Sequence, residues 1–171
     1  MRTFSIFIKV IFLLLLFYCK SSTGPDLIPS TITIDIGSNP RGICVNTSTN
    51  RIYVANAGDN NVTVIDGTTN FTTNVDVGST PFAVCVNTST NRIYVANRMS
   101  NNVTVIDGET NLVLNTIAVG DRPFKICVNP NTNMIYVVNQ DSDNVTVIDG
   151  ATAFTTNVAV APSITVTLSL S

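Results

Sequence analysis

Three cysteines that could bind a metal ion or form disulfides recur at nearly constant spacing in this sequence. Cys44 and Cys85 are 41 residues apart, and Cys85 and Cys127 are 42 residues apart. Thiolates are good zinc ligands, but the ligands of one zinc ion must lie within one small coordination sphere. Because each cysteine is the same letter of a longer repeated word, we expect the three to lie at equivalent, separated places. We interpret them as small buried apolar side chains, and not as a metal site or a disulfide framework.

Aspartates recur in the same way, each inside the tetrapeptide VIDG. A ring of carboxylates could hold a cation. Asp-Gly is also typical of tight turns, in which the carboxylate accepts hydrogen bonds from nearby backbone N–H groups. We favour the turn, and we predict neither a metal nor another cofactor. The three aspartates are Asp66, Asp107 and Asp149.

Histidine is missing from the whole sequence, which removes the commonest general base and metal ligand. The sequence also lacks a phosphate-binding glycine pattern and a serine nucleophile motif. With 9 basic and 11 acidic residues and a net charge of −2, it has no basic cluster of the kind that binds nucleic acid. These observations favour a protein that is not an enzyme and does not bind nucleic acid.

A repeated word of fourteen residues explains the constant spacing. ICVNTSTNRIYVAN occupies residues 43–56, VCVNTSTNRIYVAN residues 84–97 and ICVNPNTNMIYVVN residues 126–139. Periods near 40 residues are typical of helical arrays or of β-propeller blades. Val, Ile and Thr crowd the apolar segments, and no segment has the 3.6-residue periodicity of an amphipathic helix. The repeat therefore predicts an all-β protein.

Each repeat divides into four short apolar segments, joined by links rich in Asn, Asp, Gly, Ser and Thr that are typical of antiparallel hairpins. In the second repeat the segments are AVCVN, RIYVAN, NVTVIDG and TIAVG. RIYVAN is apolar on both alternating faces, as expected of a strand that is covered on both sides. We predict a partial β-propeller of four-stranded antiparallel blades with a 41–42 residue repeat. The blades are expected at about 41–78, 82–120 and 124–160.

The repeat resembles the YVTN-type β-propeller repeat, which is named for its Tyr-Val-Thr-Asn word. This sequence has YVAN at 53–56 and 94–97 and YVVN at 136–139, within RIYVANRMSNNVTVIDGETN and its counterparts. The resemblance extends over about residues 31–160, and it implies an exported or surface protein. Members of that family are mostly closed seven-bladed rings whose biochemical roles are largely unassigned, so the resemblance implies a fold more than a function.

The chain begins with a segment typical of an export signal. A basic start precedes the apolar run VIFLLLLFY, which is shorter than the ~20 residues that span a bilayer. LFYC at 16–19 resembles a bacterial lipobox, except that Tyr18 stands where a small residue is usual. We predict a lipoprotein-like signal peptide at 1–18, a lipidated Cys19 and a linker at 19–30. The protein is then expected at the cell envelope, anchored through lipid or, without lipidation, periplasmic or secreted; an uncleaved anchor is a further alternative.

The strand order predicts which links share a rim of the blades. The links between second and third strands, and those from a fourth strand to the next first strand, emerge together and vary in sequence; we call this the variable rim. The constant rim holds the remaining links (NTSTN, NTSTN, NPNTN, and DG each time). Loops that vary on a constant scaffold commonly determine binding specificity, although neutral drift gives the same variation. We predict a binding surface on the variable rim, formed by Arg41, Phe82, Arg98, Met99, Arg122, Phe124, Lys125 and Asp141.

The leading interpretation is a non-catalytic, exported module that binds a protein or an envelope polymer. The alternative is a fragment of a truncated or split propeller with no activity of its own, because the expected fourth repeat becomes APSITVTLSLS. A propeller enzyme is the third interpretation. Residues 31–171 are expected to hold an outer strand (TITIDI, 31–36), three blades and one possible further strand (ITVTLSL). Three blades leave two apolar faces uncovered, which predicts a second copy or a companion propeller fragment as partner.

Overall fold

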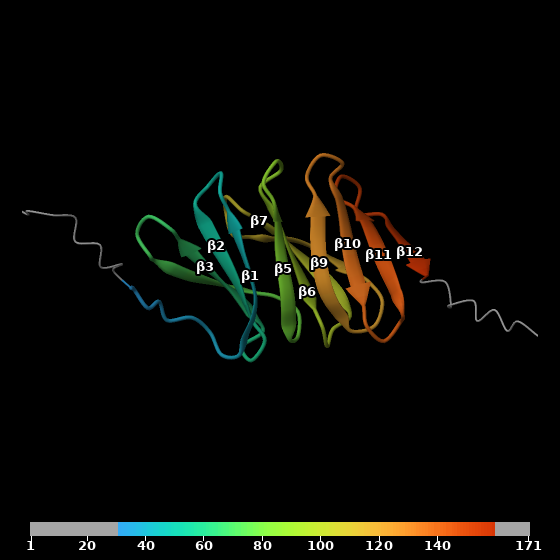
Figure 1. Ribbon diagram of the computed structural model, residues 1–171, viewed down its shortest axis with the longest axis horizontal. Coiled ribbons are helices and arrows are strands. Elements are labelled where there is room, and N and C mark those ends of the chain that lie inside the picture. The colour runs from blue at the N-terminus through green and yellow to red at the C-terminus, as the bar shows by residue number, and fades with distance from the viewer. Residues whose placement is uncertain (1–30, 160–171) are drawn as a thin grey trace, which may run out of the picture. The chain divides into compact units, whose positions relative to one another are not determined.

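The computed structural model describes residues 31–159, and their strands confirm the all-β, partial-propeller fold class (Figure 1). The chain divides into two units, residues 1–33 and 34–171, and all the described strands belong to the second. The predicted signal peptide, the linker with Cys19, and the segment ITVTLSL lie outside the described residues. Among the described residues, none belongs to a helix long and apolar enough to cross a membrane.

Three four-stranded antiparallel sheets follow one another along the described chain, and within each sheet the strands pair in sequence order. We call them blades 1, 2 and 3. Blade 1 consists of β1 (Pro40–Asn46), β2 (Arg51–Asn56), β3 (Asn61–Asp66) and β4 (Thr72–Asp76). Blade 2 consists of β5 (Pro81–Asn87), β6 (Arg92–Asn97), β7 (Asn102–Asp107) and β8 (Val113–Ala118). Blade 3 consists of β9 (Pro123–Asn129), β10 (Met134–Asn139), β11 (Asn144–Asp149) and β12 (Thr155–Ala159).

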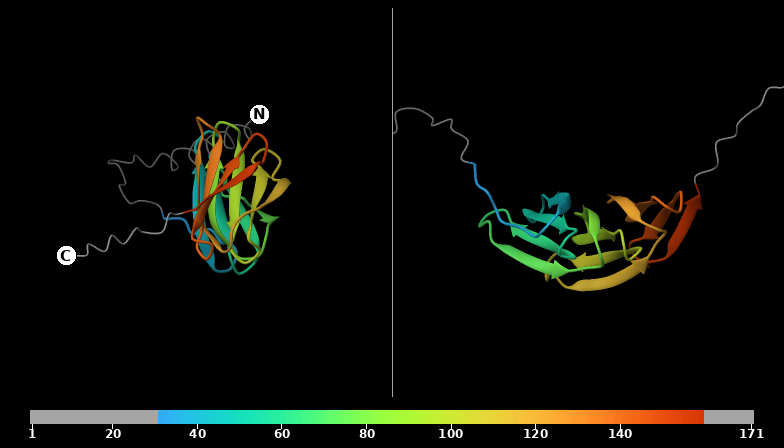
Figure 2. Two further views of the ribbon diagram at one scale, coloured as in Figure 1. Left: turned by 90° about the vertical axis from the view of Figure 1, so that its right-hand side faces the viewer. Right: turned by 90° about the horizontal axis from the view of Figure 1, so that it is seen from below.

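The first strands of neighbouring blades bring the sheets together within the second unit. β1 contacts β5, and β5 contacts β9, so these three strands lie side by side (Figure 1). Seen from below, the three sheets follow one another with their fourth strands on the outside (Figure 2). This is the arrangement of propeller blades around an axis, in which first strands are innermost.

The hydrophobic core lies between the blades. One cluster joins Tyr53 of blade 1 to Ile93 and Val95 of blade 2. A second cluster joins Tyr94 of blade 2 to Ile135 of blade 3. Neighbouring residues of β6 thus face opposite blades, and both faces of blade 2 are buried, as the double apolar pattern of RIYVAN indicated.

The outer faces of blades 1 and 3 have no neighbouring blade among residues 31–159. Ile43 of β1 is 70% exposed, whereas Val84 at the same place in blade 2 is 8% exposed. Tyr136 of β10 is 38% exposed, whereas its counterpart Tyr94 is 1% exposed. These apolar side chains are therefore of the kind found on covered faces. Among residues 31–159, faces are covered only where blade 1 meets blade 2 and where blade 2 meets blade 3.

The cysteines follow the same division between inner junctions and outer faces. Cys44 and Cys85 pack against the two core clusters. Burial raises the pKa of the Cys44 thiol to about 12 and raises that of Cys85 as well, so both stay neutral. Cys127 is exposed, because it faces the outer side of blade 3. The expectation of three buried apolar side chains is thus met only in part by Cys44 and Cys85, which are partly buried, and it is wrong for Cys127.

The strand predicted at residues 31–36 is also wrong, because residues 31–37 form no strand. A fourth strand pairs with the third strand of its own blade. In the described residues each third strand is already paired with β4, β8 or β12. Residues 31–36 therefore have no third strand with a free edge to pair with among the described residues.

Among residues 31–159 a residue other than glycine with positive φ stands at every link, four for each blade, and eight of these twelve residues are asparagine. Asparagine tolerates the left-handed conformation better than other residues with a Cβ atom. Asn91, the last residue of the second NTSTN link, has a φ of 52°. Of the four exceptions, Asp143 lies on the variable rim and Ala153 on the constant rim. The other two, Thr80 (φ 55°) and Arg122 (φ 50°), occupy the same place in successive repeats on the variable rim.

Candidate functional site

On the variable rim, backbone hydrogen bonds join the two kinds of link. The N–H of Arg98 donates to the carbonyl of Thr80 (2.9 Å), and the N–H of Met99 donates to the carbonyl of Ser79 (3.1 Å). Equivalent bonds run from Ala57 to Asn39 and from Gln140 to Arg122. The links that vary in sequence therefore lie together in space, as the strand order predicts.

Each first strand carries a β-bulge directly after its proline. In β1, Pro40 pairs with Asn56 and Gly42 pairs with Ala55, so Arg41 is the extra residue. The same register shift makes Phe82 the extra residue of β5 and Phe124 that of β9. A bulge re-aims the extra side chain out of the regular alternation of a strand. Three successive blades thus redirect one side chain each at the same place.

The redirected side chains form a continuous row across the blades. The ring centroids of Phe82 and Phe124 are 4.8 Å apart, with an interplanar angle of 30°. Over the Phe82 ring lie two guanidinium groups, that of Arg41 at 5.5 Å and that of Arg98 at 5.4 Å from the centroid. The Nζ atom of Lys125 lies 5.5 Å from the Phe124 centroid. We call these five residues the bulge row.

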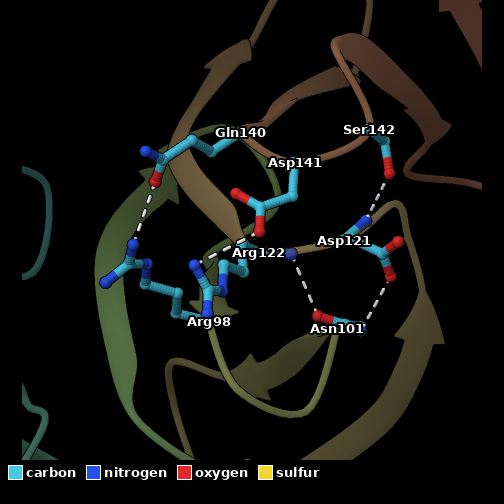
Figure 3. Close-up of polar contacts among 7 residues, drawn as sticks. All are labelled: Arg98, Asn101, Asp121, Arg122, Gln140, Asp141 and Ser142. Atoms are coloured by element: carbon cyan, nitrogen blue, oxygen red, sulfur yellow. Dashed lines mark hydrogen bonds and ion pairs between the residues drawn. The ribbon is translucent and has the colours of Figure 1, made fainter.

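Beside the bulge row, a hollow of about 240 Å³ opens between blades 2 and 3. Figure 3 shows its polar contacts. Arg122 Nη1 lies 3.2 Å from Asp141 Oδ2, and Arg98 Nη2 donates to Gln140 Oε1 at 3.0 Å. We call this feature the rim hollow. It is lined by Arg98, Met99, Asn101, Asp121, Arg122 and Asp141.

The links around the rim hollow are held by hydrogen bonds that involve side chains, two of them to backbone N–H groups. The Oδ1 atom of Asn101 accepts the N–H of Arg122 (3.0 Å), while its Nδ2 atom donates to Asp121 (2.9 Å). The N–H of Asp121 donates to Ser142 Oγ at 2.7 Å (Figure 3). Because these bonds fix the turns before any ligand arrives, little ordering would be needed on binding.

The structure brings all eight residues predicted from the sequence into these two adjoining features. The bulge row contains Arg41, Phe82, Phe124 and Lys125, the rim hollow contains Met99, Arg122 and Asp141, and Arg98 belongs to both. What sequence reasoning missed is the bulge, since a one-residue shift in pairing leaves no mark in the apolar pattern.

The constant rim is held by contacts from one blade to the next. Asn46 Nδ2 donates to Asn91 Oδ1 at 2.8 Å, and Arg51 Nη1 donates to the Gly108 carbonyl at 2.5 Å. Blades 2 and 3 repeat both bonds, from Asn87 to Asn133 (2.8 Å) and from Arg92 to Gly150 (3.1 Å). The near identity of this rim between repeats thus has a structural reason.

The aspartates of the VIDG words stabilise turns on the constant rim. Asp107 Oδ1 accepts the N–H groups of Thr110 (2.9 Å) and Glu109 (3.0 Å). The hydrogen bond from the Thr110 backbone is the main cause of its lowered pKa. Backbone N–H donors likewise lower the pKa of Asp66 and of Asp149. Within residues 31–159 no three His, Cys, Asp or Glu side chains are grouped to hold a metal ion.

One exposed apolar residue per blade on the constant rim was not singled out from the sequence. Phe71 and Phe154 are each 78% exposed, and Leu112 is 64% exposed. Each follows the positive-φ residue of the third-to-fourth link, and an apolar letter inside a polar turn was the available signal. A hollow of about 300 Å³ lies nearby between blades 2 and 3, lined in part by Leu114 and Asp149.

These blades define the chain as a β-propeller protein. The family model described as "Lactonase, 7-bladed beta-propeller" matches residues 16–154, and the chain belongs to this family. No curated protein matches the chain.

Solved structures show the same fold. Hydrazine synthase from Kuenenia stuttgartiensis is similar with a TM-score of 0.69 and 25% identity, over 78% of this chain and 39% of that chain. A functionally unknown protein from Desulfotomaculum acetoxidans DSM 771 is similar with a TM-score of 0.62 and 20% identity, over 75% of this chain and 44% of that chain. Virginiamycin B lyase from Staphylococcus aureus is similar with a TM-score of 0.64 and 11% identity, over 73% of this chain and 42% of that chain. This chain therefore spans about two fifths of the length of these structures.

Proposed function

We propose that the chain is a non-catalytic, exported propeller module whose variable rim binds a macromolecular partner, either a protein or an envelope polymer. The observation that carries the proposal is the bulge row. Three blades place their redirected side chains in contact with one another, and two of these side chains are aromatic and one is an arginine. Phe and Arg on an exposed, rigid surface are typical anchors of recognition.

Backbone strain at the same rim supports the proposal. Thr80 and Arg122 have positive φ, which costs about 1–3 kcal/mol for residues other than Gly and is better tolerated by Asn. Asn39 takes the same place before blade 1, so the fold accepts a less strained residue there. Strained conformations of this kind gather at binding sites, and the Arg122 side chain lines the rim hollow.

A retention experiment tests the proposal. Full-length protein is immobilised and exposed separately to the protein and polymer fractions of the producing cell's envelope. We expect F82A/R122A/F124A to retain at least tenfold less of one component than the wild type. The matched control F71A/F154A removes exposed rings from the constant rim and should change nothing. Equal retention by the folded rim variant and the wild type would contradict the proposal.

We also propose that export and lipidation of Cys19 place the module at the cell envelope, anchored by lipid. The support is the basic start, the apolar run and LFYC at 16–19. Cells grown with labelled fatty acid should label the wild-type protein and not Cys19→Ser. Absence of label from the wild-type protein would contradict lipidation, and a periplasmic or secreted protein would remain as the alternative.

The outer faces of blades 1 and 3 support a second partner, which is a second copy of the chain or a companion propeller fragment. Val84, the counterpart of Ile43 in blade 2, and Tyr94, the counterpart of Tyr136, are buried between described blades, so further blades of the same kind fit these faces. Sedimentation of the full chain in detergent should show a species larger than one chain. A dispersed monomer that melts cooperatively and binds no hydrophobic dye would contradict this partner; a chain that does not melt cooperatively would favour an inactive propeller fragment.

Family membership favours a second candidate function, the hydrolysis of a lactone. Asp121 and Asp141 are the carboxylates that line the rim hollow, and a carboxylate can act as a general base. We favour the binding module of YVTN-type blades, because Asp141 is paired with Arg122 and Asp121 accepts from Asn101. If the wild-type protein hydrolyses a lactone and D121N/D141N does not, the enzyme would replace the binding module as the proposed function.

A further inference from the structure

Positive charge is unevenly distributed over the described blades. Of the nine Lys and Arg residues in the chain, six lie within residues 31–159. Arg51 and Arg92 donate to backbone carbonyls on the constant rim. The other four lie on the variable rim: Arg41, Arg98, Arg122 and Lys125.

Three of these four charges have no carboxylate partner. Arg122 pairs with Asp141 at 3.2 Å, whereas Arg41, Arg98 and Lys125 form no ion pair with any residue of the described stretch. These three cations lie over the rings of Phe82 and Phe124 instead. An aromatic ring attracts a cation through its quadrupole, but it carries no net charge that would cancel the cation. The bulge row therefore keeps three positive charges that form no ion pair in the described residues, beside the carboxylates of Asp121 and Asp141 in the rim hollow.

The three charges come from three different blades. Arg41 belongs to β1 of blade 1, Arg98 follows β6 of blade 2, and Lys125 belongs to β9 of blade 3. The contacts between them run in sequence from Arg41 to Phe82, from Phe82 to Phe124 and from Phe124 to Lys125, with separations of 5.5, 4.8 and 5.5 Å. Two of the charges, those of Arg41 and Arg98, thus lie at the Phe82 ring, and that of Lys125 lies at the adjoining Phe124 ring.

We propose that the bulge row binds a linear polyanion, a polymer with repeated carboxylate or phosphate groups, which lies across the three blades. The inference rests on the binding function proposed above and specifies its ligand. A row of separated charges matches repeated anionic groups better than one small anion. A protein partner is less suitable, because cations already cover faces of both rings and the adjoining rim hollow is lined mainly by polar side chains.

The energetics agree with a polymer. One exposed ion pair contributes about 0–1 kcal/mol, so useful affinity needs several pairs formed by the same ligand. Linked groups supply them, because the second and third contacts form at high effective concentration. The rings restrict the motion of the Arg and Lys side chains before binding, which reduces the entropy lost on binding. Binding of this kind weakens strongly as salt is added.

Two defined polymers test the proposal with full-length protein. Polygalacturonate carries carboxylates and inorganic polyphosphate carries phosphates, and titration calorimetry measures each at 50 and 300 mM salt. We expect at least one polymer to bind, with at least tenfold weaker binding at the higher salt. Galacturonate monomer and inorganic phosphate should bind at least a hundredfold more weakly. The polymer that binds identifies the anionic group, and failure of both would overturn the proposal.

Matched charge variants locate the polymer on the protein. R41Q/K125Q removes two positive charges from the bulge row, and R51Q/R92Q removes two from the constant rim. We expect at least tenfold weaker polymer binding for the first variant and less than twofold for the second. F82L/F124L keeps every charge but removes the rings, and it should weaken binding about threefold. Wild-type affinity in folded R41Q/K125Q would overturn the proposal.

The two proposals can fail separately. An envelope component that is retained through Phe82, Arg122 and Phe124, but is uncharged or stays bound at 500 mM salt, would overturn the polyanion and leave the binding function standing. An acidic protein retained in place of a polymer would do the same. Absence of any retention that depends on the variable rim would overturn both.

Discussion

The two rims of the same blades use their polar side chains in different ways. On the constant rim, Asn46 and Arg51 reach across to the next blade and bind Asn91 and the Gly108 carbonyl. On the variable rim, the guanidinium group of Arg41 reaches across to an aromatic ring and keeps its charge exposed. A repeated fold can therefore concentrate stability at one rim and leave the other free to change.

The largest effect should come from the side chains that join the blades. Asn91→Ala should lower the free energy of unfolding by about 2 kcal/mol, because the buried Nδ2 group of Asn46 loses its acceptor and alanine is strained at a positive φ. Urea unfolding measures it. Arg98→Ala on the variable rim should change stability by less than about 0.5 kcal/mol. Equal effects would remove the difference between the rims.

A natural difference between blades sharpens the comparison. Met134 of blade 3 stands where blades 1 and 2 have arginine. Arg92→Met should lower stability by about 1 kcal/mol, because the bond to the Gly150 carbonyl is lost. Met134→Arg should change little, since no described blade offers it a carbonyl. Thermal melting of both variants measures this, and a neutral Arg92→Met would contradict the structural role.

Acid should weaken the constant rim. Backbone N–H donors hold the pKa of Asp66, Asp107 and Asp149 below the ordinary value of 3.8. A pKa lowered in the folded state contributes stability above pH 3.8, and this contribution is lost as the pH falls through the folded value. Urea midpoints should therefore decrease below about pH 4, and Asp107→Asn should make the dependence shallower. If the urea midpoint of Asp107→Asn depends on pH as steeply as that of the wild type, the Asp107 carboxylate does not stabilise its turn.

The smallest effect concerns strain on the variable rim. Thr80→Asn should raise stability by about 0.5 kcal/mol, because asparagine tolerates a φ of 55° better than a β-branched residue. Asn39→Thr, at the same place in the preceding repeat, should lower it by a similar amount. Chemical unfolding of both variants measures the pair. Changes of equal sign would show that the two places are not equivalent.

Much of this structure could be predicted from the sequence because period and turn chemistry are local properties. The 41–42 residue spacing of Cys44, Cys85 and Cys127 indicated blades, and the residues of VIDG indicated turns. Strand order alone placed Arg98 and Arg122 on one rim. What failed depended on neighbours: residues 31–36 lack a third strand to pair with, and Cys127 lacks a blade to cover it.

The bulge row could not be predicted because it depends on pairing register. Nothing in the letters PRG, PFA and PFK shows that Arg41, Phe82 and Phe124 are each skipped by the partner strand. Nor does the sequence show that Arg98, from a different link, lies over the Phe82 ring. Such contacts appear only when two links and two blades are placed together.

The sameness of the repeats has a consequence for folding. β2 and β6 contain the same apolar core, IYVAN, and β3, β7 and β11 are all NVTVID. A strand from one repeat can therefore pair with the neighbour of another without losing a single side-chain contact within the sheet. During synthesis the nearest partner emerges first, which favours the correct order. On refolding from denaturant at high concentration, strands of different molecules compete equally, and exchanged, entangled assemblies are the expected product.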